Sequence, residues 1–176
     1  MTLSEQMLEI HHALTSASLP HAFGGALALA WCTERARGTI DLDINVFVGP
    51  EEAPRVLAAL PPGVGWTDHD RTVIERDGQV RLWWDATPVD IFLNTTPFHE
   101  EVAGRARWEP FAGDSLPFLG CDDLAVFKAF FGRTQDWADL EAMAAAGTLD
   151  VEAVLGVITH YLGADDERIE HLRSLG

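Results

Sequence analysis

Three carboxylates are spaced so that they could share a divalent cation. Asp41 and Asp43 alternate with aliphatic residues at the start of an apolar run that ends at Val48. Alternate side chains on a β-strand point to the same face, so Asp41 and Asp43 are predicted to lie side by side. Two carboxylates held that close repel each other unless a cation lies between them. A hard cation with oxygen ligands, Mg²⁺ or Mn²⁺, is the simplest candidate.

Asp90 is the third carboxylate, within the sequence Val-Asp-Ile-Phe-Leu. An acid flanked by aliphatic residues is unusual on a strand that is buried on both faces. Asp90 either points at water from a strand end, or joins Asp41 and Asp43 as a metal ligand and general base. Upstream, Gly24 and Gly25 precede an apolar helical segment. Such a pair is either a tight turn or a backbone cradle for phosphate at a helix start.

Lys128 is the single lysine of the chain and lies in its last third. Leu124, Lys128 and Phe131 recur at helical spacing, so the lysine stem is predicted to lie on an apolar stripe. Its ammonium group either reaches water from that stripe or is aimed at a triphosphate. Asp136 and Asp139 follow on the next predicted helix, and for Asp139 simple capping or pairing is the preferred interpretation.

The elements that must position these residues follow an α+β, or mixed α/β, pattern. Helices are predicted at 3–16, 26–33, 51–60 and 97–103, strands at 22–23, 39–48 and 88–93, extended segments within 107–119, and four helices between 122 and 172. A β-hairpin is predicted from 72–76 and 79–84 around Asp77-Gly78, a pair suited to a type I′ turn. We therefore expect an α/β core over residues 1–120, with a helical sector over 121–176 packed on it.

The composition excludes some functions. A formal net charge of −16 over 176 residues argues against an extended nucleic-acid surface, because phosphate binding needs clustered Lys and Arg. No apolar run approaches the roughly 20 residues that cross a bilayer, and the start, MTLSEQMLEI, has no basic leader. Cys32 and Cys121 lie far apart without metal-ligand spacing and are predicted to be reduced core residues. We expect a cytoplasmic protein without membrane contact.

The joint order of these motifs resembles the nucleotidyltransferase superfamily related to DNA polymerase β, from about residue 22 to about residue 146. That order is Gly-Gly with a helix, Asp-x-Asp, a strand Asp, and then Lys and Asp on late helices. Within the superfamily, GGALALAW…RARGTIDLDINVFV and DLAVFKAFFGRTQDWADLEAM look most like AbiEii-type proteins, which are associated with toxin–antitoxin modules. The positions that match the AbiEii-type pattern are Arg37, Thr39, Asp41, Asp43, Lys128, Arg133, Asp136 and Asp139.

The resemblance implies transfer of a nucleoside monophosphate from an NTP to an acceptor, with release of pyrophosphate. It implies Mg²⁺ or Mn²⁺ as the cofactor, held by Asp41, Asp43 and Asp90. The implied nucleotide- and phosphate-binding positions are Gly24, Gly25, Arg37, Thr39, Lys128 and Asp136. The acceptor stays open between RNA, protein and a small molecule, and a cognate antitoxin or toxin is an expected partner.

Three alternatives remain at this point. The first is a small-molecule nucleotidyltransferase that resembles aminoglycoside- or lincosamide-modifying enzymes, since a charge of −16 suits a cationic drug. The second is a non-catalytic binding protein, such as an antitoxin, on the same fold. The third is an acidic α+β domain whose motifs are accidental. Trp83, Trp84 and Trp108 are available to stack on a base, but core packing is the preferred interpretation for each.

Overall fold

The computed structural model describes residues 1–36 and 38–176. The described chain divides into two compact units. Residues 1–25 and 38–119 form the first, which we call the sheet unit. Residues 26–36 and 120–176 form the second, the helical unit. The helical unit therefore contains an early segment of the chain in addition to the last third.

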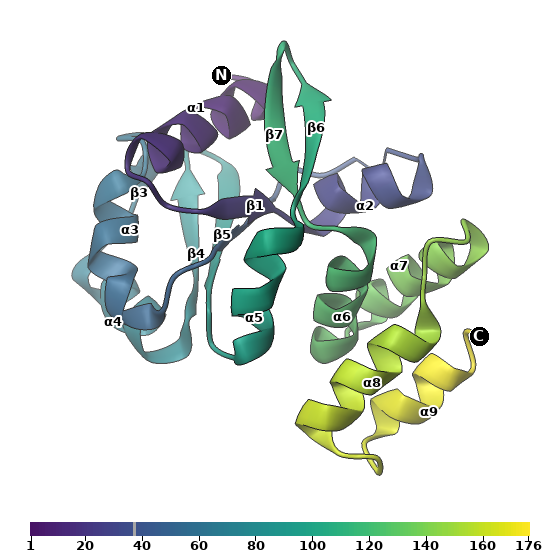
Figure 1. Ribbon diagram of the computed structural model, residues 1–176. Helices are drawn as coiled ribbons and strands as arrows, with labels where there is room; N and C mark the ends of the chain where they lie inside the picture. Colours follow the sequence, from purple (N-terminus) through teal and green to yellow (C-terminus); the bar gives the residue numbers. More distant parts are fainter. Residues whose placement is uncertain (37) are drawn as a thin grey trace. The chain divides into compact units, whose positions relative to one another are not determined.

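A mixed seven-stranded sheet, in the order β3-β4-β5-β2-β1-β7-β6, organises the sheet unit (Figure 1). Its strands are β1 (His21–Phe23), β2 (Leu42–Val46), β3 (Val64–Gly65), β4 (Gln79–Trp84), β5 (Thr87–Leu93), β6 (Arg107–Phe111) and β7 (Asp114–Phe118). The pairs β2–β5 and β1–β7 are parallel, and the other neighbouring strands are antiparallel. The chain thus has the mixed α/β architecture that its pattern predicts.

The helices of the sheet unit are α1 (Leu3–Ser16), α3 (Ala53–Ala59), α4 (Asp68–Asp77) and α5 (Pro97–Val102), with 3₁₀ turns at Pro50–Glu52 and Ala103–Arg105. A capping box starts α1: the Glu5 N–H donates to Thr2 Oγ1 and the Thr2 N–H donates to Glu5 Oε2. The helix then buries an apolar stripe that includes Met7 and Leu14, as its helical spacing predicts.

The central parallel pair separates apolar from polar residues. Leu42, Ile44 and Val46 of β2 lie in register with Val89, Ile91 and Leu93 of β5, and all six are buried. The alternate positions of these strands place Asp43 beside Asp90 on the opposite face of the sheet. Burial of the apolar face fixes the register, because a slip of one residue would move the carboxylates into the core.

The predicted hairpin around Asp77-Gly78 is wrong. Residues 68–77 form α4, which a capping box between Thr67 and Asp70 starts and Gly78 ends in the left-handed conformation (φ +68°). A left-handed glycine serves a helix end as well as a type I′ turn, so the pair alone did not distinguish the two. The real hairpin joins β4 to β5. The strand predicted at 39–48 is also shorter, so Asp41 lies just before β2.

The helical unit contains most of α2 (Gly25–Thr33), together with α6 (Cys121–Phe131), α7 (Thr134–Ala145), α8 (Val151–Leu162) and α9 (Glu167–Arg173). A disulfide between Cys32 and Cys121 joins α2 to α6, so the prediction of two reduced cysteines is wrong. The two residues are 89 positions apart, and only the packing of the helices brings them together. No helix in the described residues is both long and apolar enough to cross a membrane.

Candidate active site

The carboxylates at 41, 43 and 90 lie at one place in the sheet unit. Asp43 and Asp90 are register partners on β2 and β5, and paired residues on neighbouring strands share a face. Asp90 is 9% exposed. Asp41 approaches from the segment before β2, where its N–H donates to Thr39 Oγ1 (3.1 Å). Thr39 therefore shapes the turn that leads into the first carboxylate.

The glycine pair meets the second carboxylate. The Gly24 N–H donates to the carbonyl oxygen of Asp43 (2.8 Å). Gly25 opens α2 in the left-handed conformation (φ +54°), and a Cβ atom added to it would overlap the carboxylate of Asp43. Both the backbone conformation and the close approach require glycine at position 25. The backbone at the start of α2 and the Asp-x-Asp segment thus form one continuous surface.

Arg81 binds the carboxylates and was missed in the sequence. Its Nε–H and Nη2–H donate to the two oxygens of Asp90 (2.8 and 2.6 Å), and Nη2 also lies 3.5 Å from Asp41 Oδ2. The hydrogen bonds to Asp90, followed by the charges of Asp90, Asp41 and Asp43, raise the pKa of Arg81 above its ordinary value. The sequence could have indicated this contact, because pairing residues 79–84 with 87–93 makes Arg81 the register partner of Asp90.

Lys128 lies in the helical unit and is paired with acids there. Its Nζ lies 2.7 Å from Asp139 Oδ2 and 3.8 Å from Asp136 Oδ1, with the lysine side chain 7% exposed. Arg133 donates to both oxygens of Asp136 (2.7 and 3.2 Å), and Gln135 donates to Asp139 (2.9 Å). The ammonium group thus contacts buried carboxylates rather than water, and the pairing preferred for Asp139 is observed.

The predicted site residues are therefore divided between the two units. In the sheet unit, the structure brings together Gly24, Gly25, Thr39, Asp41, Asp43 and Asp90. In the helical unit it brings together Lys128 and Asp136. Arg37 lies outside the described residues.

The preference for core packing holds for one of the three tryptophans. Trp84 is 4% exposed, whereas Trp83 and Trp108 are 51% and 62% exposed. Burial alternates along β4, so Trp83 lies on the same outward face as Arg81. The expectation was wrong for Trp83 and for Trp108. For Trp83 the reason is that it is adjacent to Trp84 on β4, and neighbouring residues on a strand point to opposite faces.

The donor set of the three carboxylates suits a hard divalent cation, since Asp41, Asp43 and Asp90 offer only oxygen ligands. As placed, the described residues contain no group of three or more His, Cys, Asp or Glu side chains that could hold a metal ion. The carboxylates are chemically suitable, and the guanidinium group takes part of their hydrogen-bonding capacity.

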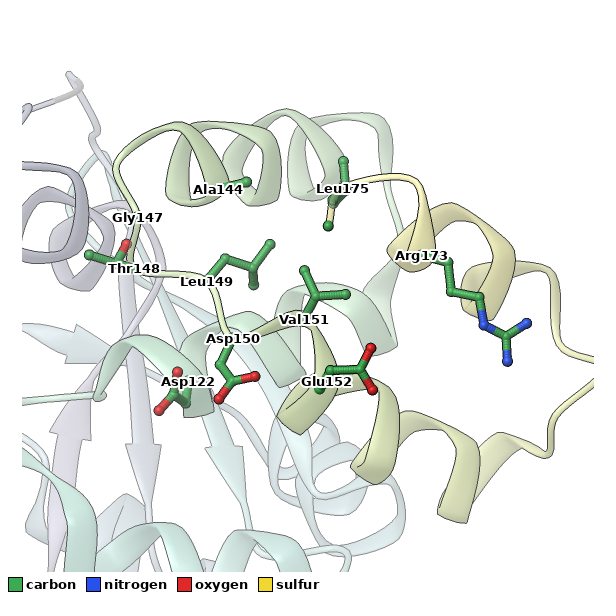
Figure 2. Close-up of a pocket in the computed structure, with 11 residues that line it drawn as sticks. Asp122, Ala144, Gly147, Thr148, Leu149, Asp150, Val151, Glu152, Arg173 and Leu175 are labelled. Carbon is green, nitrogen blue, oxygen red and sulfur yellow. The ribbon is translucent and has the colours of Figure 1, made fainter.

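A pocket of about 700 Å³ lies within the helical unit (Figure 2). Asp122, Asp150 and Glu152 line it together with Arg173 and apolar side chains such as Leu149. None of the predicted site residues is among its lining.

The comparisons with known proteins identify the fold. No protein-family model matches the chain, and no curated protein matches it. The solution structure of the antibiotic-resistance factor ANT(2″)-Ia matches with a TM-score of 0.64 at 14% identity, over 98% of this chain and 97% of that one. A crystal structure of ANT(2″)-Ia with adenylyl-2″-tobramycin matches with a TM-score of 0.57 at 16% identity, over 99% and 96%.

A fungal protein shows the same likeness. An antigenic nucleotidyltransferase-like protein from Paracoccidioides brasiliensis matches with a TM-score of 0.55 at 12% identity, over 97% of this chain and 92% of that one. At identities this low the structural likeness establishes the fold alone. The activity must be argued from the residues of the site. The chain therefore has the fold of the nucleotidyltransferases.

Proposed function

We propose that this protein is a metal-dependent nucleotidyltransferase. The observation that carries the proposal is the contact between the Gly25 backbone and Asp43, with Asp90 in register beside Asp43. It joins a helix start, which favours phosphate, to carboxylates that suit Mg²⁺ or Mn²⁺. The nucleotidyltransferase fold supports this interpretation.

In the proposed reaction, an acceptor oxygen attacks the α-phosphorus of an NTP, and the bond to the leaving pyrophosphate breaks. Asp90 takes the proton of the acceptor hydroxyl as general base. The backbone at the start of α2, from Gly25 onward, would orient the phosphates, because the Gly24 N–H already donates to the Asp43 carbonyl oxygen. A divalent cation held by Asp41, Asp43 and Asp90 would supply charge neutralisation. Positioning and electrostatics account for catalysis, as in phosphoryl transfer generally.

The substitution Asp43→Asn tests the proposal, because it removes a charge and keeps the size of the side chain. We expect transfer of label from an α-labelled NTP to fall at least about 100-fold. The variant should still unfold in a cooperative transition. Asp68→Asn is the matched control, since Asp68 is an exposed acid on α4. An unchanged transfer rate in Asp43→Asn would refute the role of the carboxylates.

A small cationic acceptor is the second candidate, because ANT(2″)-Ia shares the fold and is described as an antibiotic-resistance factor. The charge of −16 favours a cationic acceptor over RNA. Labelled transfer to tRNA, to proteins and to aminoglycosides distinguishes the three acceptor classes. Label on the aminoglycoside alone supports the second candidate.

The AbiEii-type assignment is a further proposal, supported by the motif order from Gly24 to Asp139. It predicts a cognate antitoxin or toxin as partner, and a cytoplasmic location where NTPs are supplied. Expression of the chain in growing cells, with and without Asp43→Asn, tests it. Growth arrest that depends on Asp43 supports a toxin, and normal growth with both chains contradicts one.

A further inference from the structure

Both oxygens of Asp90 are engaged by one guanidinium group. Arg81 donates from Nε and Nη2 in a fork, at 2.8 and 2.6 Å, to the side chain of an acid that is itself largely buried. Charge-assisted bonds of this kind are about twice as strong as neutral ones. A carboxylate offers roughly four lone-pair sites, and the fork uses one on each oxygen. Asp90 is therefore partly occupied before it meets any ligand.

The same guanidinium group stands among all three carboxylates. Its Nη2 lies 3.5 Å from Asp41, and the charge of Asp43 also acts on it. The charge of Arg81 thus offsets part of the charge of these carboxylates. A divalent cation bound to the same carboxylates would compete with Arg81 for the oxygens of Asp90.

The position of Arg81 allows its side chain to move away from Asp90. It lies on the outward face of β4, and its side chain is 50% exposed. The long flexible side chain can move into water without opening the core, because Val80 and Leu82 are buried on the other face of the strand.

We propose that Arg81 is an internal counter-ion that holds Asp90 before a divalent cation binds and releases it when the cation binds between Asp43 and Asp90. The proposal rests on the nucleotidyltransferase function proposed above. Arg81 then stabilises the metal-free protein and weakens the apparent affinity for the metal. It is a positioning residue, acting through Asp90.

The test measures metal binding without nucleotide. Thermal unfolding and calorimetric titration with Mg²⁺ or Mn²⁺ are compared among wild type, Arg81→Met and Arg81→Lys. Arg107→Met is the matched control, since Arg107 is a strand arginine in the same unit, is 44% exposed and pairs with Glu109 (2.6 Å). Arg81→Met should lower the half-saturating metal concentration about tenfold, or ~1.4 kcal/mol. Arg81→Lys keeps the charge and loses the two-pronged hydrogen bond. Its half-saturating metal concentration should lie between those of wild type and Arg81→Met.

Without metal, Arg81→Met should unfold at a lower temperature than wild type, and saturating metal should remove that difference. An unchanged or raised half-saturating concentration in Arg81→Met, with a normal wild-type response, would overturn the proposal and leave the nucleotidyltransferase function standing. If metal changes neither the unfolding midpoint nor the titration heat of wild type and both Arg81 variants, the counter-ion proposal and the metal-dependent function are both overturned. If Arg81→Met does not fold, Arg81→Lys decides the outcome.

Discussion

Replacing Lys128 by methionine should destabilise the helical unit strongly. The change leaves Asp136 and Asp139, whose side chains are 3% and 5% exposed, without their shared cation. Removing one partner of a buried pair costs about 3–5 kcal/mol. Arg133 still neutralises Asp136, and Gln135 still donates to Asp139, so we expect the lower end, about 3 kcal/mol. For a protein of this size the unfolding midpoint should fall by roughly 6–12 °C.

Thermal and urea unfolding measure this cost, and two comparisons identify its cause. The double variant Lys128→Met with Asp139→Leu should recover most of the loss, because replacing both charges by apolar groups removes the unpaired acid. A cost below about 1 kcal/mol in Lys128→Met would refute the buried-pair reasoning. If Lys128 instead contacts phosphate, the KM for NTP should rise while the unfolding midpoint stays unchanged.

Further predictions concern the glycine cradle, a histidine and the disulfide. Gly25→Ala should cut transfer and lower the unfolding midpoint, because its Cβ displaces the carboxylate of Asp43; an active, stable variant would contradict the close approach. Burial lowers the pKa of His21 from 6.5 to about 4. At this residue protons then bind the unfolded chain preferentially, so His21 should lower stability by at most about 3 kcal/mol as pH drops from about 6.5 towards 4; His21→Asn should reduce this slope in urea titrations, and the part due to His99, whose pKa burial also lowers to about 4, should remain. Reduction of the Cys32–Cys121 disulfide should cost about 2–5 kcal/mol; a thiol assay should find two new thiols, and an unchanged midpoint would contradict the estimate.

The periodic patterns of the sequence correctly predicted features that depend on residues close together in the chain. The alternation in β2 and β5 placed Asp43 and Asp90 on the face opposite their buried aliphatic residues, because an apolar face must be buried as a whole. The helical spacing of apolar residues in α1 also predicted a helix, and the observed bounds of α1 match the predicted range 3–16. These features depend on neighbours along the chain.

Long-range packing hid the rest. Gly78 fits a helix end and a hairpin turn. Choosing the turn gave β4 its correct bounds but paired it with residues 72–76 instead of with β5, and the pairing of Arg81 with Asp90 was missed. Nothing near Cys32 indicates Cys121, because their proximity comes from the packing of α2 and α6. Lys128 was placed on the correct helix, but its partners lie on α7, and helical spacing predicts only contacts within one helix.

The two ends of the strand order, β3 and β6, determine how the sheet meets other molecules. A free strand edge is a template for pairing with another chain, and proteins blunt such edges with short strands, charges and proline. In the described residues, β3 is two residues long, while β6 carries Pro110 between charged and aromatic residues. Neither edge offers a long, flat run of backbone groups, so edge-to-edge pairing of this sheet with a sheet of another chain is disfavoured.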